Sequence, residues 1–117
     1  MEKKTNLSYM KTLTGGDNSK LIKYINLFLQ EAPPEIDKMI TMLNEKNWDG
    51  LRTTAHTLKP KLGYMGIKEL EQDILNIEKN AEEKNNLDAL PNLVEKIKNI
   101  CAIAIRELEE EKKQLSS

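Results

Sequence analysis

Apolar residues recur along this chain at steps of three and four, the spacing that places them on one face of an α-helix. Residues 1–7 precede this pattern and are expected to form a loose lead-in. A short helix is predicted from Leu7 to Leu13, ended by Gly15-Gly16. Asp17, Asn18 and Ser19 then offer N-caps for a second helix that runs through about Glu31.

The pair Pro33-Pro34 is expected to interrupt that second helix, because proline is poorly tolerated in a helix interior. The same apolar face resumes from Ile36 to Leu43 and fades at residues 44–47. Asp49-Gly50 then reads as the opening turn of the next helix.

Two more apolar faces complete the chain. One runs from Ile67 to Ala81, and the other from Leu90 to Leu108, with Asp88 as its expected N-cap. Residues 107–113 are almost all charged and are expected to form a solvated extension. The short connections favour an all-α fold, an antiparallel four-helix bundle with an additional short N-terminal helix, and residues 1–117 are interpreted as a single domain.

The segment from Trp48 to Ile67 contains His56, the only histidine of the chain. At roughly 100° per residue, its apolar residues fall within an arc of about 80°, and His56 lies about 140° from the centre of that arc. The side chain is therefore expected to point to solvent or to a partner. On the same wheel, Arg52, Lys59 and Gly63 lie on the His56 side, at roughly 100°, 80° and 120° from the centre of the apolar arc. The apolar residues of this arc are Leu51, Ala55, Leu58, Leu62 and Met65.

Composition narrows the classes of function. The net charge of −1 gives no field that would favour nucleic acid or an anionic membrane. No run approaches the roughly 20 apolar residues of a membrane span. The single cysteine, Cys101, excludes an internal disulfide framework and suits a reducing compartment, so a cytoplasmic location is expected. Cys101 lies on the apolar face of the last helix and is interpreted as a core residue.

The run Ala55-His56-x-Leu58-Lys59, with Gly63 and Gly66 following, resembles the signature of histidine phosphotransfer (HPt) domains, the helical carriers of two-component phosphorelays. The resemblance implies that His56 accepts a phosphoryl group on Nε2. It implies a response-regulator receiver domain and a sensor or hybrid histidine kinase as partners. It also implies that Mg²⁺ sits on the receiver, with no metal or other cofactor on this chain and no kinase activity of its own. The sequence departs from the family in one place, because Pro60 stands where the family usually has glycine.

Roles for the neighbouring residues follow from this resemblance and from the wheel. Lys59, one turn after His56, is expected to neutralise phosphoryl charge. Gly63 leaves clearance for a partner. The family often has a polar residue 22 positions after the histidine that hydrogen-bonds the other imidazole nitrogen, and here that residue is Glu78. Arg52, with Lys61, is interpreted as docking charge. Pro60 removes a helical N–H and is expected to kink the helix just after His56.

Other interpretations remain open at this stage. The histidine could be an ordinary surface residue, and Glu78 could be a surface residue beside Lys79. An HPt-like bundle could dock a receiver or another partner without phosphotransfer, which Pro60 favours. A plain helical module could dimerise through its C-terminal helix, although a monomer is expected. A metal site is disfavoured because one histidine with a distant carboxylate is a poor ligand set.

Overall fold

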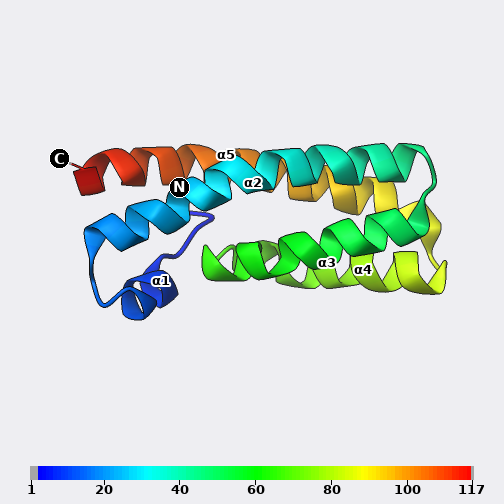
Figure 1. The fold of residues 1–117 in the computed structure, drawn as a ribbon. Helices are drawn as coiled ribbons and strands as arrows, with labels where there is room; N and C mark the ends of the chain where they lie inside the picture. The colour runs from blue at the N-terminus through cyan, green and yellow to red at the C-terminus, as the bar shows by residue number, and fades with distance from the viewer. Residues whose placement is uncertain (1–2, 117) are drawn as a thin grey trace.

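The computed structural model describes residues 3–116, and within them it contains helices and no strand (Figure 1). This confirms the predicted all-α class. The α-helices are α1 (Ser8–Leu13), α2 (Asn18–Asn44), α3 (Trp48–Tyr64), α4 (Glu71–Glu83) and α5 (Leu90–Ser116), and two short 3-10 turns, η1 (Lys68–Leu70) and η2 (Leu87–Ala89), precede α4 and α5.

Four of these helices, α2 to α5, lie side by side with successive helices antiparallel (Figure 1). The helices differ in length, since α2 and α5 have 27 residues each, α3 has 17 and α4 has 13. The long pair therefore extends past the end of the short pair. The short helix α1 lies beside this overhang, near the C-terminal end of α3 (Figure 1).

The core consists of the apolar faces that the periodicity picks out. All five apolar residues of the histidine helix are at most 2% exposed. Their burial fixes the rotation of α3 and turns the opposite face outward. The faces of α4 and α5 are buried with them, at Ile67, Leu70, Ile74, Ile77 and Ala81, and at Leu90, Val94, Ile97, Cys101, Ala104 and Leu108.

The predicted interruption at Pro33-Pro34 is wrong, because α2 continues through both prolines. Each proline removes one helical N–H at a cost of roughly 3 kcal/mol or more. Ala32 and Ile36, on either side of the pair, are buried in the core. Packing along a helix of this length outweighs the local penalty, and only Pro34 of the pair is exposed to solvent.

The segments near the two chain termini, residues 3–7 and 107–113, are held more firmly than the sequence indicated. Residues 1–2 of the expected lead-in lie outside the described residues, but residues 3–7 are fastened by hydrogen bonds to α5 and to the end of α3. Residues 107–113 continue α5, with Glu109, Glu110 and Lys113 exposed as expected and Leu108 buried on the expected apolar face. Lys112 Nζ additionally donates to Asn26 Oδ1 at 3.1 Å. Asp88 lies inside η2 rather than at an N-cap.

Candidate functional site

The histidine helix begins at a tight turn against α2. The Asn47 side chain caps α3 by accepting a hydrogen bond from Gly50 N–H at 2.9 Å. Gly50 packs so closely against Met42 Sδ and the Asn47 side chain that a Cβ atom would clash with both. Asp49-Gly50 is therefore the opening turn of the helix, as predicted. The turn and the buried face together fix which side of α3 meets solvent.

His56 lies on that solvent side, with its side chain 65% exposed. Its Nδ1 is 2.7 Å from Glu78 Oε1 on the neighbouring helix α4. The second oxygen of the same carboxylate, Oε2, accepts a hydrogen bond from Lys59 Nζ at 2.9 Å. Glu78 thus joins the imidazole and the ammonium group, and we call these three residues the His56–Glu78–Lys59 cluster.

Electrostatics determine the tautomer of His56 within this cluster. Partial burial raises the pKa of Glu78, but hydrogen bonds from Lys59 and His56, with their charges, outweigh this and hold that pKa below its ordinary value. Glu78 is therefore ionised at neutral pH and can only accept hydrogen bonds. The proton of a neutral imidazole must then reside on Nδ1, which leaves the lone pair on Nε2.

The helix continues unbroken through Pro60 as far as Tyr64. Residue 60 would normally donate its N–H to the carbonyl of His56, and proline has no N–H to give. The His56 carbonyl is thus left without its helical partner. The expected kink at this point stays a prediction.

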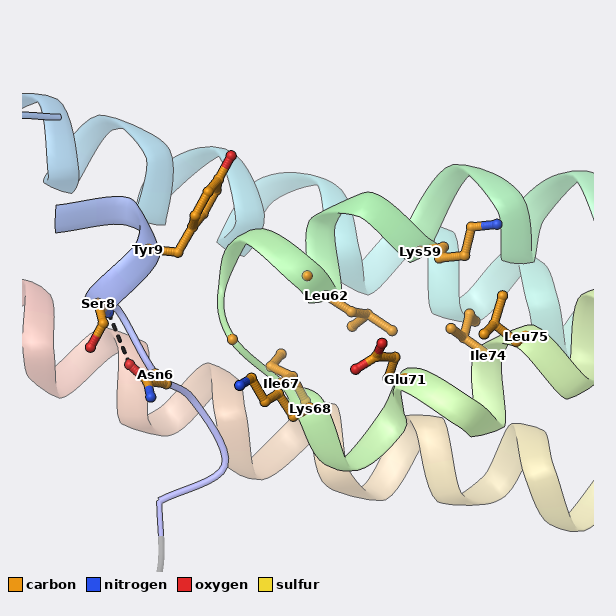
Figure 2. A pocket seen from close by; sticks show the side chains of 12 residues that line it. Asn6, Ser8, Tyr9, Lys59, Leu62, Ile67, Lys68, Glu71, Ile74 and Leu75 are labelled. Carbon is orange, nitrogen blue, oxygen red and sulfur yellow. Dashed lines mark hydrogen bonds between the residues drawn. The ribbon is translucent and has the colours of Figure 1, made fainter. Parts of the chain in front are cut away.

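Gly63 lies two turns after His56 on the exposed side of α3, and a Cβ added there would meet no atom within 4 Å. It borders a cavity of about 560 Å³ between the end of α3, the start of α4 and the segment leading into α1. In Figure 2, Asn6, Ser8 and Tyr9 lie at one end of this cavity and Lys59 lies at the other. The cavity therefore adjoins the His56–Glu78–Lys59 cluster.

The two cations that were predicted to help docking, Arg52 and Lys61, lie in different surroundings. Arg52 is half-buried on α3, one turn before His56, and no ion pair among residues 3–116 includes it. Lys61 turns toward α2, where Nζ donates to Glu35 Oε1 at 2.5 Å and lies 4.0 Å from Glu31 Oε1. Because these carboxylates neutralise its charge, Lys61 contributes little to the field around His56.

Sequence reasoning missed the aromatic contact beside this site. The rings of Tyr9 on α1 and Tyr64 at the end of α3 stack with centroids 6.1 Å apart and planes 6° from parallel. Both rings remain about half exposed. A short helix such as α1 has no periodicity long enough to fix its rotation, so no sequence signal indicated this pairing.

Two other features of the described residues bear on the site. Within residues 3–116, no group of three or more His, Cys, Asp or Glu side chains is arranged to hold a metal ion. None of the helices in that range combines the length and the apolar character that crossing a membrane demands.

Comparison with known protein families gives a match over most of the chain. The family model described as the Hpt domain matches residues 23–116, from the second turn of α2 to the end of α5. Comparisons with curated proteins and with solved structures gave no match. The matched range contains the whole His56–Glu78–Lys59 cluster, whereas α1 and the segment before it lie outside that range.

Proposed function

The chain belongs to the Hpt domain family, and we propose that His56 is its phosphoryl carrier. Domains of this family are phosphotransfer modules of two-component signalling rather than kinases. The observation that supports the proposal most directly is the hydrogen bond between His56 Nδ1 and Glu78 Oε1 at 2.7 Å, because it leaves Nε2 unprotonated on a side chain that is 65% exposed.

The proposed transfer is an in-line displacement at phosphorus. Nε2 of His56 attacks the phosphorus of an aspartyl phosphate on the partner. The N–P bond forms as the P–O bond to the aspartate breaks, and the aspartate leaves as a carboxylate. The Nδ1 proton stays in its hydrogen bond to Glu78, which stabilises the positive charge that develops on the ring. The reverse reaction regenerates the neutral imidazole.

Lys59 supplies the positive charge near the phosphoryl oxygens. Its ammonium group already lies within the cluster, 2.9 Å from Glu78, and its side chain is one-third exposed. A lysine side chain has enough rotatable bonds to turn from the carboxylate toward a phosphoryl group on the same face. Phosphorylation would therefore draw Lys59 away from Glu78 without any movement of the helices.

The partner is proposed to be a response-regulator receiver domain, which carries the aspartate and the Mg²⁺. A sensor or hybrid histidine kinase is proposed as the other partner of the relay. Gly63 and the adjoining cavity provide clearance for the receiver beside His56, because nothing fills the space next to that glycine. Arg52 contributes an unpaired positive charge one turn from the histidine.

A second candidate is a domain that docks a receiver without carrying phosphate. Pro60 favours it, since the proline removes a backbone hydrogen bond at the His56 carbonyl and replaces the glycine that is usual in the family. The cluster around His56 favours the carrier, because a docking surface does not require a fixed tautomer.

Transfer from a panel of phosphorylated receiver domains tests the two candidates. Wild-type protein is compared with His56→Gln, and Lys98→Gln on the exposed face of α5 serves as the control. If His56 is the phosphoryl carrier, an acid-labile, alkali-stable phosphate appears on wild type and on the control, and none appears on His56→Gln. Receivers that bind wild type but transfer no phosphate would establish the docking domain instead.

A further inference from the structure

Helix α1 has little packing of its own to hold it in place. It has six residues, and Met10 is the only one of them that is buried. Helices this short are not stable on their own. Apart from Met10 and the stacking of Tyr9 on Tyr64, its position depends on the residues at either end. The segment on its N-terminal side, residues 3–7, is called the strap here.

The strap is fastened to α5 mainly by the carboxylate of Glu107. Weaker support comes from ion pairs of Lys3 Nζ with Glu111 Oε2 at 3.8 Å and of Lys4 Nζ with Glu69 Oε1 at 2.8 Å. Glu107 Oε1 accepts hydrogen bonds from Lys4 N at 3.0 Å, Thr5 N at 3.0 Å and Thr5 Oγ1 at 2.9 Å. Its second oxygen, Oε2, lies 2.9 Å from the same Lys4 N. Hydrogen bonds to an ionised acceptor are about twice as strong as neutral ones. Three donors from two consecutive residues thus converge on Glu107.

The strap then crosses the end of the histidine helix. Asn6 N donates to the Met65 carbonyl at 3.0 Å, and the Asn6 side chain accepts from Ser8 N at 2.9 Å to start α1. Gly66 adopts φ +67°, and a Cβ there would clash with the backbone of Asn6. Glycine at this position therefore provides both the left-handed turn after α3 and the space for the strap.

The strap and α1 together form one end of the cavity beside the proposed phosphorylation site. Asn6, Ser8 and Tyr9 line that end, while Lys59 lines the other (Figure 2). If the strap were released, Tyr9 would lose its fixed position against Tyr64 and the cavity would lose that end. The hydrogen bonds at Glu107 thereby help to hold the shape of the surface next to His56, although Glu107 itself lies on a different helix.

We propose that Glu107 is a positioning residue for receiver docking, which it controls by fastening the strap and so holding α1 beside the cavity. This inference rests on the proposed function, since it concerns the partner of the same site. Glu107 acts through α1 and touches none of the His56–Glu78–Lys59 cluster. Its loss is therefore expected to weaken docking and to leave the transfer step itself unchanged.

Glu107→Gln tests the proposal, because it removes the charge and replaces one acceptor oxygen with an amide donor. Glu109→Gln is the matched control, since Glu109 is exposed two residues further along α5. Thr5→Val removes only the hydroxyl donor and is expected to show a smaller effect in the same direction. Far-UV circular dichroism verifies that each variant is folded.

The first readout is single-turnover transfer from a phosphorylated receiver at several receiver concentrations. Glu107→Gln is expected to raise the receiver concentration for half-maximal rate about tenfold and to leave the saturating rate within about twofold of wild type. Glu109→Gln should match wild type in both. An unchanged half-maximal concentration, or a lower saturating rate alone, overturns the proposal.

The second readout requires no receiver. Amide hydrogen exchange should become about tenfold faster at Lys4, Thr5 and along α1 in Glu107→Gln, while protection in α3 is retained. Unchanged exchange in α1 overturns the proposal. If wild type itself accepts no phosphate from any receiver, the proposed function fails, and this readout still decides whether Glu107 fastens the strap.

Discussion

At the scale of single residues, Glu78 connects the two groups that the chemistry needs. Its two oxygens contact different partners, His56 Nδ1 and Lys59 Nζ, so one carboxylate orients the imidazole and holds the lysine nearby. The three residues also differ in exposure, with side chains 65%, 33% and 17% exposed for His56, Lys59 and Glu78. The group that meets the partner is thus the most accessible, and the group that orients it is the least.

The ionisation of Glu78 leads to a pH-dependent contribution to stability. Its pKa in the folded state lies below the ordinary 4.5, so the unfolded chain binds the proton more tightly. The stabilisation from Glu78 is therefore complete above about pH 4.5 and is lost as the pH falls through the folded-state pKa. Urea denaturation should show Glu78→Gln less stable than wild type at about pH 7, with the difference shrinking toward about pH 3.

The control for this experiment is Glu82→Gln, an exposed carboxylate one turn further along α4. Its stability difference from wild type should stay small at both pH values. A difference for Glu78→Gln that grows on acidification would contradict the assignment of Glu78 as an ionised acceptor.

At the scale of elements, the bundle tolerates prolines inside two of its helices. Pro33 and Pro34 lie in α2, and Pro60 lies in α3. Each removes a hydrogen-bond donor that the helix would otherwise use, so these helices are held by their buried faces rather than by local preference. Pro60 differs from the other two because the carbonyl it leaves unpartnered belongs to His56.

Replacing Pro60 with alanine should therefore stabilise the protein. The change restores the N–H that bonds to the His56 carbonyl, and the expected gain in unfolding free energy is about 1–3 kcal/mol. Pro91→Ala is the matched control, because Pro91 lies in the first turn of α5, where proline is well tolerated. Urea denaturation measures both. Equal effects for the two variants would show that Pro60 causes no particular strain.

Most helices, but not all of their boundaries, could be predicted from the sequence. The buried faces of α3, α4 and α5 follow from periodicity alone, because one helix face must meet the core wherever the neighbours lie. The break predicted at Pro33-Pro34 is wrong, because the local effect of proline is outweighed by the tertiary packing of α2 on both sides of the pair.

Part of the candidate site could likewise be predicted from the sequence, and part could not. The wheel placed His56, Lys59 and Gly63 on one exposed face, and the resemblance to the family suggested Glu78, which the structure places 2.7 Å from His56. Their roles in transfer stay predictions. The strap could not be predicted, because its contacts with Glu107 join residues 103 positions apart in the sequence. A carboxylate within a run of charged residues gives no sign of such a partner.

At the scale of the whole molecule, unequal helix lengths create the surface beside His56. The principal extents are 46 × 24 × 22 Å, and the long dimension is set by α2 and α5. Because α3 and α4 are shorter, the overhang of the long pair leaves room for the strap and α1. The cavity lies where the short pair ends, between the bundle on one side and the strap and α1 on the other.

The single thiol reports on the integrity of the whole bundle. Burial raises the pKa of Cys101 to about 12, and the side chain is fully covered. A thiol reagent at about pH 8 should therefore react with the native protein at least a thousandfold more slowly than with the denatured chain. In the matched control, Ala102→Cys combined with Cys101→Ala, the thiol is exposed on the same helix and should react quickly. Fast reaction of native wild type would contradict the packing of α5.

The fastening of the strap by Glu107 has a consequence for the protein during its synthesis. During translation Lys4 is added to the chain 103 residues before Glu107, the acceptor of its hydrogen bond. A nascent chain that already contains His56 and Glu78 would still lack Glu107, which accepts the hydrogen bonds of the strap. Such a chain would not yet present the completed cavity, so the surface beside His56 would become available to a partner only after translation had passed residue 107.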